Sequence, residues 1–336
     1  MTAKNRRHMP SITATALFAL AAVSGIATAH GQTPVPANAF PSRPVTIVVP
    51  YGAGSSTDIL ARIIAKQMAQ DLGQPVVVEN RAGAGGTLGS AAVAKAVPDG
   101  HTLVMGTISS HSINASMMPK ISYDVLRDFT PVSLAAYFPN VLAVSKDVPA
   151  NNLQELVALG KTKGGLSFAT GGVGSSGQLA GELLKLRTGI PMVHVPYKEV
   201  GQAVADTMAG HVPVIIYQVP ALVSHIKAGN LKALAVLQPQ RTALLPDVPT
   251  PGEQGIQGFD ATAWMGLFGP AQMPPGVTAR LQKSMADATA NPEVRTQLAQ
   301  QGFTPVGSSP TEFRQFLEKD IAKWAQVVKA TGATID

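Results

Sequence analysis

The clearest pattern of apolar and polar positions lies in residues 45–64, where a short apolar run gives way to helical spacing. Every residue at 45–49 is β-branched, and Pro50 followed by glycines closes the run, which predicts a buried strand. Beyond the glycine-serine turn, apolar side chains recur at helical spacing at Ile59, Leu60, Ile63 and Ile64. A helix N-terminus presents free backbone N–H groups and the positive end of the helix dipole, so this junction favours an anion.

A second stretch, residues 166–184, repeats this arrangement. An apolar run at 166–171 leads into Gly-x-Gly-Ser-Ser and then into apolar helix positions. A constant offset of 120 residues relates Gly52 to Gly172, Gly54 to Gly174, Ser55 to Ser175 and Ser56 to Ser176. Two such turns favour a cleft between two lobes that holds a carboxylate-bearing molecule from both sides. The alternative is a chance match, because glycine-serine turns are common at strand-to-helix junctions.

The rest of the chain alternates predicted strands with helices, which indicates an α/β fold. Strands at 45–49, 76–79 and 101–105 each end in a loop of small polar residues. In a parallel sheet such ends lie along one edge, where ligands of open α/β folds bind. Later strands are predicted at 141–145, 166–171, 192–195, 212–217 and 231–237, so a second parallel sheet is expected.

The predicted order of strands and helices also divides the chain into two lobes. Residues 41–140 with 260–336 are assigned to lobe 1, and residues 141–259 to lobe 2. The chain ends in three predicted helices at 275–288, 292–301 and 313–330. We expect the last of them to pack along the outside of a lobe, without a function of its own.

The N-terminus has the pattern of a secretory signal peptide, predicted at residues 1–29. Basic residues precede a largely apolar run at 12–27, and Ala27-Thr28-Ala29 resembles a signal peptidase site. The run is shorter than a typical membrane span, which favours cleavage near Ala29 over anchoring. A flexible lead is expected at 30–40. The mature protein is therefore predicted to be periplasmic.

Composition and net charge limit the classes of molecule that the protein is expected to bind. Hydrophobic residues make up 45% of the chain and charged residues 14%, which is typical of a well-packed globular protein. The net charge of +6 includes three basic and no acidic residues before His30, so the mature charge is 6 − 3 = +3. Because dense basic runs with interleaved aromatics are missing, we expect no nucleic-acid partner. With no cysteine in the chain, disulfides, thiolate metal sites and a cysteine nucleophile are excluded.

Two enzyme classes remain as alternatives. Gly172-x-Gly174-x-x-Gly177 with Glu199 formally fits a dinucleotide fingerprint, which makes an exported or mis-targeted oxidoreductase the alternative function. A secreted serine hydrolase would need a nucleophile motif, and the sequence has no Gly-x-Ser-x-Gly, Ser-x-x-Lys or His-Glu-x-x-His. His111 and His194 are interpreted as packed or hydrogen-bonded residues rather than bases. We expect no catalytic residue, no metal ligand and no cofactor.

Six blocks in order resemble the Bug-type (TctC-like) solute receptors of tripartite tricarboxylate transporters. They are PSRPV at 41–45, GQPVVVENR at 73–81, PDGHTL at 98–103, HVPYK at 194–198, HIKAG at 225–229 and LPDVPT at 245–250. The resemblance implies a two-lobed, type II-like periplasmic binding protein in which each lobe is a mostly parallel sheet flanked by helices. It also implies capture of a small carboxylate and its delivery to membrane permease subunits. We expect the receptor to be a monomer.

The resemblance further places two ligand-binding loops, at 51–58 and 170–178. Together with the turn chemistry, it predicts ligand contacts from Tyr51, Gly54, Ser55, Ser56, Thr57, Asp58, Thr107, Ser109, Thr170, Gly174, Ser175, Ser176, Gln178, Tyr197, Tyr217 and Gln218. Many relatives carry aspartate where this chain has Tyr217. Losing that acid removes a partner for a ligand amine, which favours a plain di- or tricarboxylate, aromatic ones included, over an amino acid.

Overall fold

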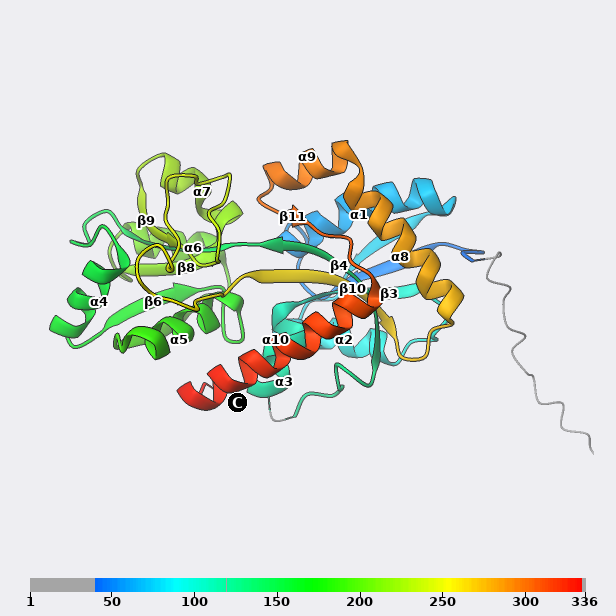
Figure 1. Cartoon of the computed structure of the whole chain (residues 1–336), viewed down its shortest axis with the longest axis horizontal. Coiled ribbons are helices and arrows are strands. Elements are labelled where there is room, and N and C mark those ends of the chain that lie inside the picture. The colour runs from blue at the N-terminus through cyan, green and yellow to red at the C-terminus, as the bar shows by residue number, and fades with distance from the viewer. Residues whose placement is uncertain (1–39, 119, 334–336) are drawn as a thin grey trace, which may run out of the picture. The chain divides into compact units, whose positions relative to one another are not determined.

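The computed structural model describes residues 40–118 and 120–333. The predicted signal peptide at 1–29 and the predicted lead at 30–40, apart from Phe40, therefore lie outside the described residues. The described residues belong to one compact unit and contain two β-sheets with flanking helices, as Figure 1 shows. This arrangement confirms the predicted α/β class. None of the described helices combines the length and apolarity that crossing a membrane would require.

The first sheet has the strand order β11-β4-β10-β3-β1-β2. Its members are β1 (Val45–Val49), β2 (Val76–Asn80), β3 (Thr102–Thr107), β4 (Phe129–Phe138), β10 (Ala263–Pro270) and β11 (Thr304–Pro305). β1 pairs in parallel with β2 and β3. β10 is antiparallel to β3 and β4, and β11 is antiparallel to β4. We call this sheet and the helices packed on it the first lobe.

The second sheet has the order β7-β6-β8-β5-β9 and defines the second lobe. Its members are β5 (Asn140–Ser145), β6 (Leu166–Thr170), β7 (Met192–Pro196), β8 (Val214–Gln218) and β9 (Leu231–Val236). β6 pairs in parallel with β7 and β8, whereas β5 is antiparallel to β8 and β9. The lobe boundaries at 140 and 260 stay a prediction, although the strands divide between the sheets in the same order.

Helices connect the strands in both lobes. In the first lobe they are α1 (Ser56–Leu72), the 3₁₀ turn η2 (Ala84–Gly86), α2 (Thr87–Ala94), the π-helical turn η3 (Ser109–Ile113), α3 (Asn114–Met117), α8 (Pro275–Ala290), α9 (Pro292–Gln300) and α10 (Pro310–Thr331). In the second lobe they are α4 (Leu153–Thr162), α5 (Ser176–Thr188), α6 (Val200–Met208) and α7 (Val219–Lys227).

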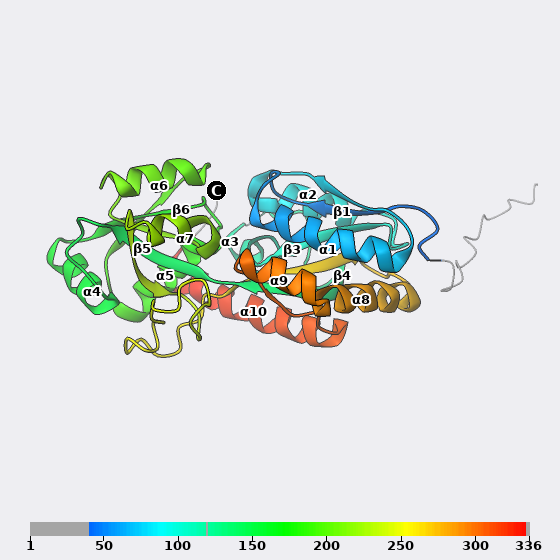
Figure 2. The same ribbon diagram turned by 90° about the horizontal axis from the view of Figure 1, so that it is seen from above.

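Both sheets are mixed, so the prediction of mostly parallel sheets was wrong. The chain leaves the first sheet through β4 and continues directly into β5 (Figure 2). It later returns to the first sheet through β10, which Figure 1 labels beside β4. β10 lies between β3 and β4 and is antiparallel to both. In the same way, β5 lies between β8 and β9 and is antiparallel to both. The strand β4 itself was not predicted. Pro131 lies within it, and the pairing with β10 shifts in register between Leu267 and Phe268.

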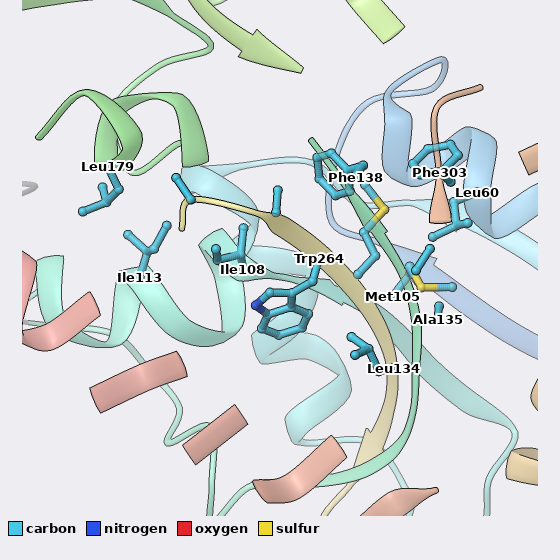
Figure 3. Packing of buried hydrophobic residues seen from close by; sticks show 14 of the residues in the cluster. Leu60, Met105, Ile108, Ile113, Leu134, Ala135, Phe138, Leu179, Trp264 and Phe303 are labelled. Carbon is cyan, nitrogen blue, oxygen red and sulfur yellow. The ribbon is translucent and has the colours of Figure 1, made fainter. Parts of the chain in front are cut away.

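The crossing strands lie in the largest hydrophobic core. Figure 3 shows Trp264 of β10 and Phe138 of β4 among buried side chains from both lobes. Trp264 is fully buried, and its indole Nε1 donates to Asp320 Oδ2 of α10 at 2.8 Å. α10 begins with the predicted capping box at Ser309 and Glu312. It packs against β4 and also against α5 of the second lobe, so it spans both lobes instead of lying along the outside of one.

Candidate functional site

A cavity of about 260 Å³ lies where loops of the two lobes meet. Its lining from the first lobe is Tyr51, Gly54, Ser55, Ser56, Thr57, Gly85, Thr107, Ile108, Ser109, Phe138 and Met265. Its lining from the second lobe is Asn140, Gly171, Val173, Gly174, Ser175, Ser176, Gly177, Val200, Ile216, Tyr217, Gln218 and Ala221. Among the described residues that line the cavity, none has a charged side chain. Any anion held here must therefore be bound by neutral donors.

The first lobe contributes residues 52–58, which we call the first cradle. Ser55 caps α1, and its Oγ accepts from the backbone N–H of Asp58 at 3.3 Å. In return, Asp58 Oδ2 accepts from the backbone N–H of Gly54 at 2.9 Å. This reciprocal pair closes the turn in the manner of a capping box. Gly54 has a φ of 78°, which a residue with a side chain rarely adopts.

The second cradle, residues 172–178, repeats these bonds around the cap of α5. Ser175 Oγ accepts from the backbone N–H of Gln178 at 3.2 Å. Gln178 Oε1 accepts from the backbone N–H of Gly174 at 2.7 Å, and Gly174 has a φ of 75°. The sequence repeat thus corresponds to a structural repeat. A neutral amide here takes the place of the Asp58 carboxylate.

Each cradle leaves the first N–H groups of its helix directed away from the helix body. Ser56 and Thr57 begin α1, and Ser176 and Gly177 begin α5. The first N–H groups of a helix have no intrahelical acceptor, and the helix dipole makes them favourable donors to an anion. All four of these residues line the cavity. Gly177 allows close packing there, because a Cβ on it would lie 2.4 Å from the carbonyl oxygen of Ile216.

A charged network behind the first cradle holds it in place. Asp58 is buried and accepts from Arg62 Nε at 3.0 Å and from Asn80 Nδ2 at 2.9 Å. Burial acts to raise the pKa of Asp58, but the hydrogen bonds from Arg62, Gly54 and Asn80 outweigh it and lower the pKa below its ordinary value. Asp58 is therefore an ionised part of the scaffold.

Two tyrosines supply hydroxyl groups from opposite lobes. Tyr51 Oη lies 2.8 Å from Thr107 Oγ1, and burial raises the pKa of Tyr51. Burial and then the charge of Glu199 raise the pKa of Tyr217, so both phenols stay protonated. Glycines make room for them. A Cβ on Gly86 would lie 2.8 Å from Tyr51 Oη, and one on Gly171 would lie 2.8 Å from Tyr217 Cε2.

The lobes also contact each other across the cavity. Ser56 Oγ of the first cradle donates to Gln218 Oε1 at the end of β8. In the second lobe, Ser176 Oγ donates to Asn140 Oδ1 at 3.3 Å, and Asn140 Nδ2 donates to the carbonyl of Ala261 at 3.2 Å. Asn140 thereby ties the second cradle to both segments that cross between the sheets.

Most of the predicted contacts line the cavity, although their role in binding stays a prediction. The exceptions, which lie outside the lining, are Asp58, Thr170, Gln178 and Tyr197. Asp58 and Gln178 are committed to closing their own cradles. Thr170 Oγ1 contacts His194 Nε2 at 2.6 Å and accepts from Ser175 Oγ at 3.2 Å. Tyr197 Oη donates to Asp206 Oδ2 at 2.7 Å. Burial and this carboxylate raise the pKa of Tyr197 to about 12.

Sequence reasoning missed several lining residues. Asn140 could have been suspected, because it is a lone polar residue before the apolar run of β5. Ile216 and Met265 are apolar strand residues that look like ordinary core positions in the sequence. Val200 and Ala221 come from α6 and α7, and no local signal relates them to the cradles.

The two histidines interpreted as packed residues are neutral in the structure. His111 is fully buried, and burial lowers its pKa to about 3. Burial and then the charge of Lys185 lower the pKa of His194 to about 4. Neither histidine lines the cavity. In the part of the chain that the structure describes, no cluster of acidic or histidine side chains could hold a metal ion.

Comparison with known proteins identifies the family. The model of the tripartite tricarboxylate transporter family receptor matches residues 60–333. The chain belongs to this receptor family. Protein BugT of Bordetella pertussis is 40% identical over 320 residues, covering 94% of this chain and 98% of that protein. The predicted Bug-type resemblance and the two-lobed receptor fold are thereby confirmed.

Two solved structures are similar over nearly their whole length. An R. palustris protein solved with adipate has a TM-score of 0.80 and 33% identity, covering 87% of this chain and 98% of that one. MatC from Rhodopseudomonas palustris, solved with bound malate, has a TM-score of 0.77 and 35% identity, covering 86% of this chain and 100% of that one. The protein is thus a periplasmic-type solute receptor.

Proposed function

We propose that this receptor captures a di- or tricarboxylate in the cavity and releases it to the permease subunits of a tripartite transporter. The observation that carries the proposal is the pair of helix N-termini, at Ser56 and Ser176, that line one cavity from opposite lobes. Each offers free backbone N–H groups, whereas the hydroxyls of Ser56 and Ser176 already donate to Gln218 and Asn140. Two carboxylates at opposite ends of a ligand would each meet one set of donors.

Neutral donors suit a receptor that must also release its ligand. An anion bound by amides and hydroxyls needs no buried counter-charge, so the empty cavity leaves no unpaired cation behind. Closure of the lobes would exclude water and strengthen each hydrogen bond. The hydrogen bond from Ser56 to Gln218, which joins the two lobes beside the cavity, would help to hold such a closed state. We infer binding without chemistry.

The ligands of two relatives support a dicarboxylate. Adipate and malate are both dicarboxylates, and they are named in the two similar structures. In this chain the cavity has no carboxylate to pair with a ligand amine, and Tyr217 offers an aromatic face and one hydroxyl instead. Apolar side chains of Phe138, Ile216 and Met265 can contact the carbon skeleton between the carboxylates. We therefore favour a plain aliphatic or aromatic dicarboxylate over an amino acid.

The oxidoreductase alternative has less support. The acidic residue of the fingerprint, Glu199, lies outside the cavity lining. A volume of about 260 Å³ is also below the range of about 300–1,000 Å³ that is usual for drug-sized ligands. We retain export through the predicted signal peptide, action in the periplasm and a monomeric state as parts of the proposal.

Thermal denaturation of the mature protein tests this function. We would screen aliphatic and aromatic carboxylates, amino acids and nicotinamide dinucleotides. A ligand that binds only the folded state should stabilise it by about 2.7 kcal/mol at a hundredfold excess over its dissociation constant. We expect a raised midpoint with a dicarboxylate. Stabilisation by amino acids alone, or by a dinucleotide alone, would contradict the proposal.

A further inference from the structure

A chain of hydrogen-bonding groups runs from the cavity wall into the core of the first lobe. Tyr51 Oη lies 2.8 Å from Thr107 Oγ1, which lies 3.4 Å from Ser110 Oγ. Ser110 Oγ in turn lies 2.9 Å from His111 Nδ1. Tyr51 and Thr107 line the cavity, whereas Ser110 and His111 do not. The chain therefore links a cavity hydroxyl to a buried titratable ring.

The far end of this chain is enclosed by aromatic side chains. The His111 ring stacks on Phe268 at 4.2 Å between centroids and meets Phe129 edge-on at 4.7 Å. Gly106 is required beside it, because a Cβ there would lie 2.6 Å from His111 Nδ1. His111 Nε2 finds no hydrogen-bond partner among the described residues. One ring nitrogen is thus bonded and the other is not.

The backbone restricts the direction of the hydrogen bonds in the chain. The N–H of Thr107 donates to Ser110 Oγ at 3.1 Å, and the N–H of Ser110 donates to Thr107 Oγ1 at 3.3 Å. Each hydroxyl oxygen therefore already accepts one bond. If His111 Nδ1 also donates to Ser110, the Ser110 proton can go only to Thr107, at Oγ1 or at the carbonyl. Donation to Oγ1 leaves the Thr107 proton to Tyr51.

We propose that His111 is a positioning residue for the ligand: its Nδ1–H tautomer orients Ser110 and Thr107 so that the Tyr51 hydroxyl donates into the cavity. This inference rests on the proposed function, since the Tyr51 proton, whose acceptor in this structure is the Gly85 carbonyl at 3.4 Å, would turn to a ligand carboxylate. The ring itself never touches the ligand. It decides whether Tyr51 presents a proton or a lone pair to the cavity.

The unpaired nitrogen favours this tautomer. If the proton were on Nε2, a buried N–H would have no acceptor among the described residues, and leaving a buried donor without a partner is costly. With the proton on Nδ1, the donor is satisfied by Ser110 and only a lone pair is left over. Burial also keeps the ring neutral, because it lowers the pKa of His111 to about 3.

Nitrogen-15 NMR of the histidine rings tests the tautomer without any ligand. The His111→Phe variant assigns the His111 signals, and the wild-type spectrum should show a protonated Nδ1 and an unprotonated Nε2 at neutral pH. A proton on Nε2 would overturn the proposal. This outcome is independent of what the cavity binds, so it leaves the proposed function untouched.

A double-mutant cycle tests the effect on the ligand, using whichever dicarboxylate stabilises the wild type. Tyr51→Phe should weaken binding about tenfold, because a hydrogen bond to a charged group is lost. His111→Phe keeps the aromatic packing and should weaken binding about three- to tenfold. In the Tyr51→Phe background, His111→Phe should have almost no further effect. The proposal is wrong if His111→Phe lowers the affinity equally in the wild type and in Tyr51→Phe, or if it leaves the affinity of the wild type unchanged.

The matched control is Tyr123→Phe. Tyr123 Oη donates to the backbone carbonyl of Ser110 at 2.5 Å, so it belongs to the same aromatic cluster but not to the chain of hydroxyls. This variant should lower stability and leave affinity within about twofold of the wild type. A loss of affinity equal to that of His111→Phe would mean that packing, not proton direction, controls the site.

Discussion

Replacing Ser176 by proline should lower the affinity for the ligand on the order of 100-fold while the protein still folds. Ser176 is the first residue of α5, a position at which proline is tolerated because its N–H makes no intrahelical bond. The preceding residue, Ser175, already has the extended φ and ψ of −74° and 154° that a following proline requires. The substitution therefore removes one backbone donor and one hydroxyl from the cavity without breaking the helix.

The control for this variant is Ser176→Ala, which removes the hydroxyl and keeps the N–H. It should cost about 1 kcal/mol of binding free energy, because Asn140 loses the hydroxyl donor that ties it to the second cradle. Calorimetric titration of both variants separates the two donors. If the alanine and proline variants bind equally well, the backbone amide is not a ligand contact, and the cradle hypothesis fails at this helix.

Replacing Trp264 by alanine should lower the free energy of unfolding by about 3–5 kcal/mol. Trp264 is fully buried on β10, where its ring meets Phe313 and Phe316 of α10 at 5.7 and 5.6 Å between centroids. The change would leave a large cavity at the strand that returns from the second lobe. It would also remove the indole donor from the buried carboxylate of Asp320.

Trp264→Phe separates packing from hydrogen bonding. Phenylalanine fills most of the space, and Asp320 keeps the donor from Trp324 at 3.1 Å and an ion pair with Lys323 at 3.0 Å. We expect a cost of about 1–3 kcal/mol. Urea denaturation, monitored by far-ultraviolet circular dichroism, measures the free energy of unfolding of both Trp264 variants. A loss below about 1 kcal/mol in the alanine variant would show that α10 is not held through this residue.

The cradles could be predicted because they are local. Glycine at the left-handed positions 54 and 174, and serine at the caps 55 and 175, are chosen by hydrogen bonds within a few residues. The same logic predicted the capping box of α10. Turns and helix caps of this kind depend on residues that are adjacent in sequence, so a single sequence is enough to predict them.

What could not be predicted depends on contacts between distant segments. The first sheet is mixed because β10 pairs with β3 and β4 from far along the chain, and the second is mixed because β5 pairs with β8 and β9. Thr170 was expected at the ligand because the resemblance places it in the second loop, and Tyr197 because it ends a strand. The end of a strand does not reveal that Thr170 contacts His194, or that Tyr197 donates to Asp206 on the next helix. The role of Asn140 likewise depends on Ala261.

The central claim is that two helix N-termini hold two carboxylates of one ligand. Calorimetric titration of a dicarboxylate that stabilises the protein, against the monocarboxylate of equal chain length, tests it most directly. We expect the monocarboxylate to bind at least about 100-fold more weakly, because one cradle loses its charged partner. Equal affinities for the two compounds would show that a single cradle binds the ligand, and would contradict the account.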